Sequence, residues 1–280
     1  MSDTIERTPA GSVIQYGDSN DRVYLIKTAP DDYPSIIEKI TFIARENRYG
    51  KIFAKIPVWM LPGFLADGFM IEAHVPGMNR GVEAVFFVSK FLTSDRLLDI
   101  ETDKLRELSH LLKTRHKIIR DEISDEYLVK ELKPADAERI ASVFSKVFMT
   151  YPFPINDPQY IYKTFGSGTR YFGIENSTGK LIAVSSSEID REYQNAEMTD
   201  FAVSKDYRGK KLSVILLMEM EKYMKRAGIR TLYTIARLNS IPMNKTFLRL
   251  GYRYSGTLIK NTNIAGKIES MNVLYKSTGG

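Results

Sequence analysis

Hydrophobic positions in the second half of the chain repeat with the periods of strands and helices in turn. Residues 127–132 alternate as a strand does. Beyond Pro134 the apolar residues return at helical spacing, at 137, 140, 141, 144, 147 and 148, which predicts a helix with one buried face. Asp157-Pro158 is a typical helix start, and it predicts a second, short helix through Phe165.

The remaining pattern places strands on both sides of a long apolar helix. The predicted elements are a hairpin at 169–175 and 180–190, strands at 196–203 and 230–236, an apolar helix from Leu212 to Gly228, a helix at 241–250 closed by Gly251, and final strands at 252–260 and 268–276. The strand, helix and strand around Leu212 form a βαβ unit. We therefore predict an α/β fold with a mixed sheet.

The first 92 residues resemble a degenerate repeat of this order of elements. A helix at 34–47, a strand at 51–57, a short helix at 58–66 and a strand at 82–91 correspond in order to the elements from Leu212 onward. Chance agreement of common α/β spacings is the alternative. We predict a degenerate module at 1–94, a charged linker at 95–126 that is helical over 103–119, and a complete domain at 127–277.

Composition excludes several classes of protein. Hydrophobic residues make up 43% of the 280 positions and charged residues 26%, as in ordinary globular domains. Cysteine is absent and the three histidines have no ligand-like spacing, so we expect no metal site. Without a long apolar run or a signal peptide, we expect a cytoplasmic protein with no membrane contact. The net charge of +6 is spread along the chain, so no nucleic-acid partner is expected.

A basic, glycine-containing turn precedes the helix at Leu212. It reads Arg208-Gly209-Lys210-Lys211. The free N–H groups and the dipole at a helix start attract phosphate, and the basic side chains add full charges. The pattern predicts a diphosphate ligand, whereas a solvated strand-to-helix turn is the plainer alternative.

This turn resembles the acyl-CoA-binding motif of the GNAT superfamily of N-acetyltransferases, Arg/Gln-x-x-Gly-x-Gly/Ala after a strand. Lys211 stands where the motif has its second Gly, and we expect it to keep a negative φ; Ser213 replaces the last small residue. The resemblance implies a GNAT fold after a degenerate GNAT-like module, with acetyl-CoA as cosubstrate. The implied coenzyme-binding residues are Phe201, Ala202, Val203, Arg208, Gly209, Lys210, Lys211, Leu212, Ser213, Asn239, Asn244 and Phe247.

An amine acceptor must lose a proton before it attacks the thioester, because its pKa lies near about 10.4. In the histone-acetylating branch of the superfamily the base is a glutamate after an alanine, as in Ala196-Glu197 here. Glu197 is our first candidate for the base. Asp200 competes with it, and the alternation of a strand places the two carboxylates on opposite faces.

The fold that the motif implies also supplies groups that act on the thioester and on the thiolate that leaves it. The backbone N–H at the end of the same strand polarises the carbonyl, which places Val203 in that role. The tyrosine that often protonates the thiolate is replaced by Phe247. Tyr252, Tyr254 or a water could take its place, or the thiolate could leave unassisted.

The segment Tyr151-Pro-Phe153-Pro resembles a loop of the β-lysine acetyltransferases, and residues 51–57 and 72–76 extend that resemblance to most of the chain. It implies acetylation of the terminal amine of β-lysine to make an osmolyte. The acceptor residues would be Arg170 or Arg237 for the carboxylate, Asp157 or Asp200 for the 3-amino group, and Tyr151, Phe153 and Tyr160 for the methylenes. A well-packed loop between helices is the structural alternative.

Other functions stay open at this point. The acceptor could be lysine, a polyamine or a protein amine, and the altered motif could also mark a non-catalytic acyl-CoA sensor. A small-molecule amine is the expected partner, and a homodimer is compatible with the sequence.

Overall fold

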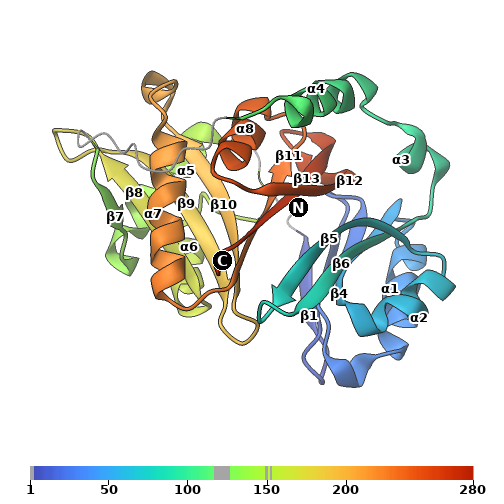
Figure 1. The fold of residues 1–280 in the computed structure, drawn as a ribbon. Coiled ribbons are helices and arrows are strands. Elements are labelled where there is room, and N and C mark those ends of the chain that lie inside the picture. The colour runs from blue at the N-terminus through green and yellow to red at the C-terminus, as the bar shows by residue number, and fades with distance from the viewer. Residues whose placement is uncertain (1–2, 117–126, 149–150, 152, 280) are drawn as a thin grey trace.

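The computed structural model describes residues 3–116, 127–148, 151 and 153–279, which form two mixed sheets (Figure 1). Within these residues the first sheet has six strands in the order β1-β2-β3-β4-β6-β5. They are β1 (Thr4–Arg7), β2 (Val13–Gly17), β3 (Arg22–Lys27), β4 (Lys51–Pro57), β5 (Met70–Asn79) and β6 (Glu83–Phe91). Helices α1 (Ser35–Glu46) and α2 (Leu61–Ala66) bury their apolar sides against one face of it.

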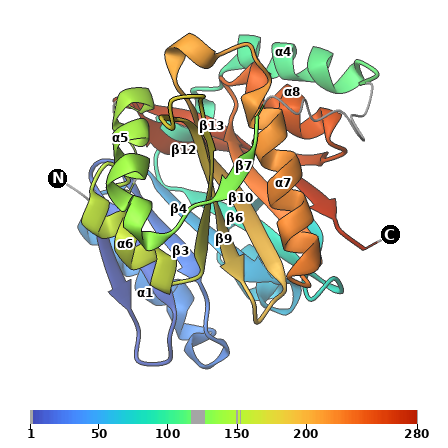
Figure 2. The same ribbon diagram turned by 90° about the vertical axis from the view of Figure 1, so that its left-hand side faces the viewer.

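The second sheet has seven strands among the described residues, in the order β12-β13-β11-β10-β9-β8-β7. They are β7 (Val129–Glu131), β8 (Thr169–Glu175), β9 (Leu181–Asp190), β10 (Asn195–Val203), β11 (Thr231–Arg237), β12 (Arg253–Ile264) and β13 (Lys267–Ser277). Helices α5 (Ala137–Val147) and α6 (Pro158–Gly166) cover one face, and α7 (Leu212–Arg226) and α8 (Ile241–Arg249) cover the other (Figure 2). The predicted α/β fold with a mixed sheet is confirmed.

The two sheets share one strand order. In the first sheet β3 and β4 are parallel neighbours joined through α1, and antiparallel β6 and β5 follow. In the second, β10 and β11 are parallel neighbours joined through α7, and antiparallel β13 and β12 follow. This agreement is what the internal repeat of the sequence predicts. The strands before residue 34 and the strand β5 were not part of that prediction.

The two sheets meet through an apolar layer. It combines Tyr24, Phe53 and Phe87 of the first sheet with Tyr233 and Leu258 of the second. At Gly256 the strand β12 passes so close to β5 that a Cβ there would overlap the carbonyl oxygen of Glu72. Glycine is required at this crossing because any side chain would push the sheets apart.

A buried ion pair lies at the same crossing. The Nζ of Lys51 is 2.8 Å from a carboxylate oxygen of Glu72, and their side chains are 0% and 6% exposed. Both groups also bond to the backbone of Ile259 in β12, from Lys51 Nζ to its carbonyl at 2.6 Å and from its N–H to Glu72 at 2.6 Å. Ser89 donates a further hydrogen bond to Glu72. Burial lowers the pKa of Lys51 to about 8, so the lysine is still charged at neutral pH.

The segment between the sheets does more than connect them. It holds α3 (Ser94–Leu98) and α4 (Thr102–Lys113), so the predicted linker helix is shorter than expected, and its predicted end at 117–119 lies outside the described residues. Arg96 is 6% exposed and binds Asp21 at 2.5 Å and the carbonyl of Lys260 at 2.9 Å. A charged residue of the linker thus joins the first sheet to β12.

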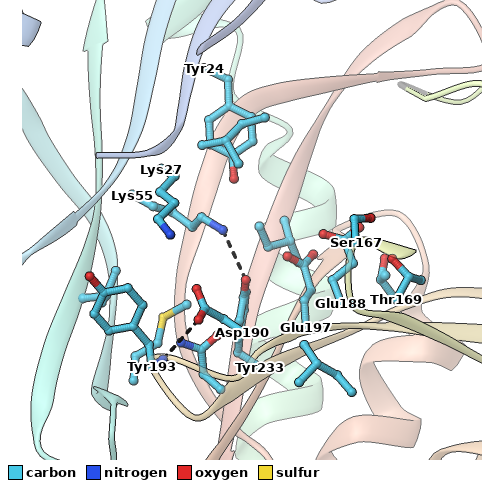
Figure 3. Close-up of a pocket in the computed structure, with 18 of the residues that line it drawn as sticks. Tyr24, Lys27, Lys55, Ser167, Thr169, Glu188, Asp190, Tyr193, Glu197 and Tyr233 are labelled. Carbon is cyan, nitrogen blue, oxygen red and sulfur yellow. Dashed lines mark hydrogen bonds between the residues drawn. The ribbon is translucent and has the colours of Figure 1, made fainter. Parts of the chain in front are cut away.

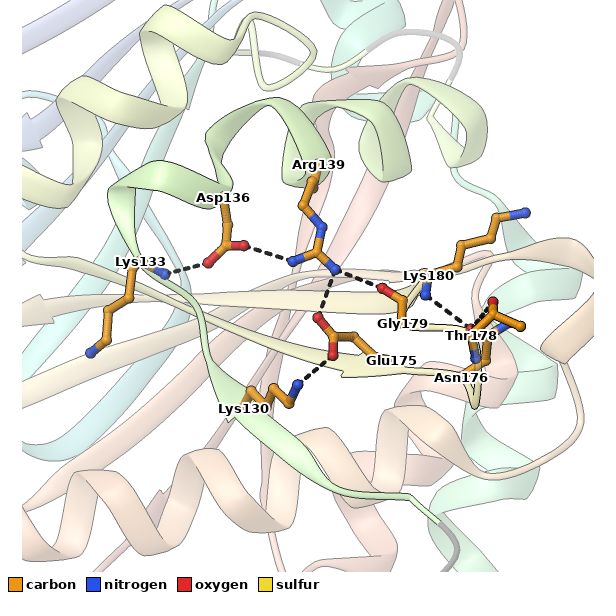
Figure 4. A network of polar contacts seen from close by, with 9 residues as sticks. All are labelled: Lys130, Lys133, Asp136, Arg139, Glu175, Asn176, Thr178, Gly179 and Lys180. Atoms are coloured by element: carbon orange, nitrogen blue, oxygen red, sulfur yellow. Dashed lines mark hydrogen bonds and ion pairs between the residues drawn. The ribbon is translucent and has the colours of Figure 1, made fainter.

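A polar network fixes α5 to the outer hairpin of the second sheet (Figure 4). Arg139 bonds to Asp136 at 2.8 Å, to Glu175 at 2.6 Å and to the carbonyl of Gly179 at 3.0 Å. Lys130 of β7 bonds to the second oxygen of Glu175, and these two cations lower the pKa of the Glu175 carboxyl. The network fixes α5, which shares a core with α6, and α6 contributes Tyr160 to the wall of the site described below.

Removal of the buried lysine should be far more damaging than removal of a half-buried one whose partner is exposed. Lys51→Met leaves Glu72 buried and unpaired, so we expect it to lower the free energy of unfolding by about 3–5 kcal/mol. Lys90→Met breaks a pair with the partly exposed Asp67 and should cost below about 1 kcal/mol. Urea titrations measure both, and a double variant Lys51→Met/Glu72→Leu should recover much of the loss. Equal effects of the two single variants would contradict this account of the crossing.

Candidate active site

The strands β10 and β11 separate at the centre of the second sheet. Their parallel pairing runs from Asn195↔Thr231 to Glu197↔Tyr233, and within the described strands it ends there. The N–H of Ser204 bonds to the carbonyl of Ile182 in β9. Because successive N–H groups of a strand point to opposite sides, the N–H of Val203 points toward the gap beside β11. Val203 therefore stays a candidate for the donor that polarises the carbonyl.

A β-bulge in β10 changes the face of the sheet to which the side chain of one candidate base, Asp200, points. The register with β9 shifts between Thr199 and Ala202, and Asp200 has a φ of +56°. The expectation that Asp200 lies on the opposite face from Glu197 is therefore wrong. Met198 stays fully buried on the α7 side, whereas Glu197, Thr199 and Asp200 all line one pocket.

This pocket lies between the two sheets and has a volume of about 920 Å³. The second sheet and its helices contribute Glu188, Glu197 and Asp200 together with aromatic residues, and the first sheet contributes Tyr24 and Lys55. Figure 3 shows Lys55 reaching from β4 toward Tyr233 of β11, to which its Nζ bonds at 3.2 Å. The cavity is thus shared by the two halves of the chain.

The carboxylates of the pocket hold their protons more strongly than usual. Burial is the main cause that raises the pKa of Glu197, and Asp200 adds to it, while Lys55 and the Tyr233 hydroxyl oppose it. Burial also raises the pKa of Asp200, against hydrogen bonds from Ser186, Tyr151 and Thr199. A carboxylate with a raised pKa is a stronger base near neutral pH.

Aromatic residues form the wall opposite the first sheet. Tyr151, Phe153 and Tyr160 all line the pocket, as predicted for a channel around methylenes. Burial and the nearby Asp200 raise the pKa of Tyr151 well above its ordinary value, so its hydroxyl stays protonated and donates to Asp200. Arg170 also lines the pocket and bonds to the carbonyl of Thr169 at 3.0 Å.

Two predicted acceptor residues lie elsewhere. Asp157 caps α6 by accepting a hydrogen bond from the N–H of Gln159 at 2.9 Å, and it does not line the pocket. Arg237 forms a two-point ion pair with Glu269 of β13, at 2.9 and 2.7 Å, and is likewise outside the pocket. Local partners hold both side chains in place, so the structure gives them structural roles in place of the predicted binding roles.

The basic turn lies immediately before α7. Gly209 has a φ of +83°, and Lys211, at the N-terminal end of the helix, has a φ of +59°. The expectation of a negative φ for Lys211 is therefore wrong: the lysine adopts the left-handed conformation that glycine has in the motif. No side chain caps the helix start. The N–H groups of Leu212 and Ser213 thus begin the helix beside Arg208 and Lys210, although the side chain of Leu212 is buried in the core.

The other predicted coenzyme residues are less accessible. Asn244 is fully buried, and its amide bonds to the carbonyls of Arg237 and Ser240 and to Asn272. The amide of Asn239 bonds to Glu101 of the linker at 3.3 Å. Ala202 is buried under α5, so that only its backbone can serve a ligand. The geometry gives Asn244 a structural role, because no part of its side chain reaches the surface.

Phe247, which stands where the family has its tyrosine, and Tyr252, the candidate to replace that tyrosine as proton donor, are both buried. Phe247 is 0% exposed and packs edge-to-face against both Phe201 and Tyr252 in the core beneath α7. Tyr252 is 3% exposed, and its hydroxyl faces Glu221 of α7, which together with burial raises the pKa of the phenol. A proton donor for the leaving thiolate must be accessible, so the structure does not support Tyr252 in that role.

The sequence prediction missed the contribution of the first sheet and of β9. Tyr24, Lys55 and Glu188 line the pocket beside Glu197, and Tyr233 faces them from β11. One feature of the sequence pointed to Lys55: it is a charged residue inside a strand, and the residues on either side of it, Ala54 and Ile56, are apolar. Such a residue is placed in a buried strand only where it has a partner or a function.

Comparisons with known proteins identify the family of this chain. The model of the acetyltransferase (GNAT) family matches residues 137–252. The β-lysine N(6)-acetyltransferase of Methanococcus maripaludis is 39% identical over 95% of this chain and 96% of its own length. The N-acetyltransferase YodP of Bacillus subtilis is 30% identical over 99% of both chains. Among solved structures, the ribosomal-protein-S18-alanine N-acetyltransferase of Escherichia coli covers 55% of this chain and 95% of its own, at a TM-score of 0.49 and 15% identity. On the strength of its full-length relatives, the chain belongs to the GNAT acetyltransferases, in the family of the β-lysine acetyltransferases.

Proposed function

We propose that this enzyme transfers the acetyl group of acetyl-CoA to the terminal amine of β-lysine. The observation that carries the proposal is the charge pattern of the pocket between the sheets. Glu188, Glu197 and Asp200 offer negative charge to an acceptor with two ammonium groups. Lys55 and Arg170 line the same pocket and offer positive charge to its carboxylate. The name of the relative from Methanococcus maripaludis supports the same acceptor.

Different residues of the chain bind the coenzyme, polarise the thioester carbonyl and remove the proton of the amine. Acetyl-CoA supplies a thioester whose carbonyl carbon accepts the amine; as the C–N bond forms the C–S bond breaks, and coenzyme A leaves as its thiolate, which needs no donor from the chain because thiol pKa values lie near about 8.5. The N–H groups at the start of α7 and Arg208 bind the pyrophosphate, and the N–H of Val203 polarises the thioester carbonyl. Glu197 takes the proton of the acceptor ammonium, and Tyr151 holds Asp200 in place through its hydrogen bond.

The product chemistry fits a compatible solute. β-Lysine carries two ammonium groups and one carboxylate, and acetylation of one amine leaves a zwitterion with no net charge. We therefore propose that the product serves as an osmolyte in the cytoplasm. None of the described helices is long and apolar enough to cross a membrane. A homodimer and the absence of nucleic-acid partners stay predictions.

Loss of the arginine in the phosphate turn should weaken coenzyme binding. We expect Arg208→Ala to raise the Kd of acetyl-CoA about tenfold at low salt, since it removes a charge-assisted hydrogen bond. Lys225→Ala, at the far end of α7, is the control and should leave the Kd unchanged. Gly209→Val keeps all charges but disfavours the φ of +83°, so it tests the backbone separately. Calorimetric titration in which Arg208→Ala and Lys225→Ala behave alike would remove the phosphate role from this turn.

Glu197 should control the pH dependence of turnover. Because its pKa is raised, the carboxylate gains a proton at a higher pH than an ordinary glutamate does, and wild-type activity should decline on the acid side of the pH profile. Glu197→Gln should be slow at neutral pH and approach wild type at high pH, where free amine is abundant. The Kd of acetyl-CoA should stay the same. A pH–rate profile of Glu197→Gln that matches wild type, with a slow Asp200→Asn, would assign the base to Asp200.

The acceptor itself can be identified by competition of related amines. We expect kcat/KM for β-lysine to exceed the values for α-lysine, cadaverine and a peptide lysine, because a site with buried charges rejects analogues that leave those charges unpaired. A thiol-release assay with the four acceptors measures this. Comparable values for all four, or a preference for the peptide, would refute β-lysine as the acceptor and leave the acetyltransferase activity intact.

A further inference from the structure

Glu188 is a carboxylate of the pocket to which the reaction described above assigns no particular group of the acceptor. It lies in β9, directly opposite Glu197 in β10 and Thr169 in β8. Its side chain is exposed to the pocket that it lines. Among the residues that the structure describes, no donor or cation lies within bonding distance of its carboxylate, although Lys55 interacts with it at longer range.

The position of Glu188 is costly for the folded chain. Residues directly opposite in antiparallel strands have Cβ atoms about 5 Å apart, and like charges there are destabilising. Burial, Glu197 and Asp200 all raise the pKa of the Glu188 carboxyl. The cation nearest to the pair, Lys55, already bonds to Tyr233. Glu188 and Glu197 therefore face one cavity, and the positive charge around them is too small to neutralise two carboxylates.

We propose that Glu188 binds the second ammonium group of the acceptor, while Glu197 faces the amine that reacts. This inference rests on the proposed function and assigns the recognition of the 3-amino group. Four carbons separate the two nitrogens of β-lysine, which gives a span of about 6 Å when extended. That span matches the spacing of two side chains on directly opposed strand positions.

Asp200 is less suited to this task than Glu188. Its carboxylate already accepts hydrogen bonds from Tyr151, Ser186 and Thr199. These donors occupy the oxygens and hold the group against the aromatic wall. Glu188 has its oxygens free for a ligand, so an incoming ammonium gains more there.

A pair of substrates tests the assignment. 6-Aminohexanoate has the carboxylate and the terminal amine of β-lysine but lacks the 3-amino group. The measured quantity is the ratio of kcat/KM for β-lysine to that for 6-aminohexanoate, in wild type, Glu188→Gln, Glu188→Asp and the control Glu192→Gln. Glu192 forms a surface ion pair with Lys27, so its variant removes a nearby charge outside the pocket.

We expect Glu188→Gln to lower this ratio about tenfold or more, because the amide no longer carries the charge that distinguishes the two substrates. Glu188→Asp should restore part of the ratio, and Glu192→Gln should keep the wild-type ratio. An unchanged ratio in Glu188→Gln, with both substrates slowed alike, would overturn the inference. A wild-type enzyme that acetylates other amines but not β-lysine would instead refute the proposed function.

Discussion

The architecture depends on how two mixed sheets are held face to face. Lys51 and Glu72 form a buried pair in the first sheet, and both bond to the backbone of Ile259 in the second. The full hydrogen-bonding capacity of a buried pair must be met for it to be stable, and here the opposite sheet meets part of it. Gly256 permits the close approach, and Arg96 ties the linker to the same strand. Separation of the sheets would remove the hydrogen bonds that the backbone of Ile259 makes with both charges.

This crossing explains why the active site needs the whole chain. The second sheet alone provides the gap between β10 and β11 and the bulge that brings Asp200 beside Glu197. The first sheet has the same strand order, and its β4 places Lys55 over Tyr233. The first sheet thereby covers the pocket in which we propose that the acceptor binds, and the relatives from Methanococcus maripaludis and Bacillus subtilis match the chain over both sheets.

The sequence predicted the elements and the phosphate turn, because periodicity and helix starts are local properties. It could not predict contacts that depend on irregular backbone or on distant segments. Alternation placed Asp200 opposite Glu197, and the bulge reversed this. Tyr252 and Arg237 looked available until the structure placed them beside Glu221 and Glu269. Glu188 escaped notice because a lone glutamate in a strand is ordinary until its neighbour across the sheet is known.

The central claim is that the acceptor is bound between the two sheets and touches both. A crystal structure of the enzyme with coenzyme A and β-lysine tests this most directly. The account predicts a ligand with one amine at Glu197, the other at Glu188, and its remaining surface against Tyr24 and Lys55 of the first sheet. A β-lysine molecule bound by residues of the second sheet alone, with no contact to the first, would contradict it.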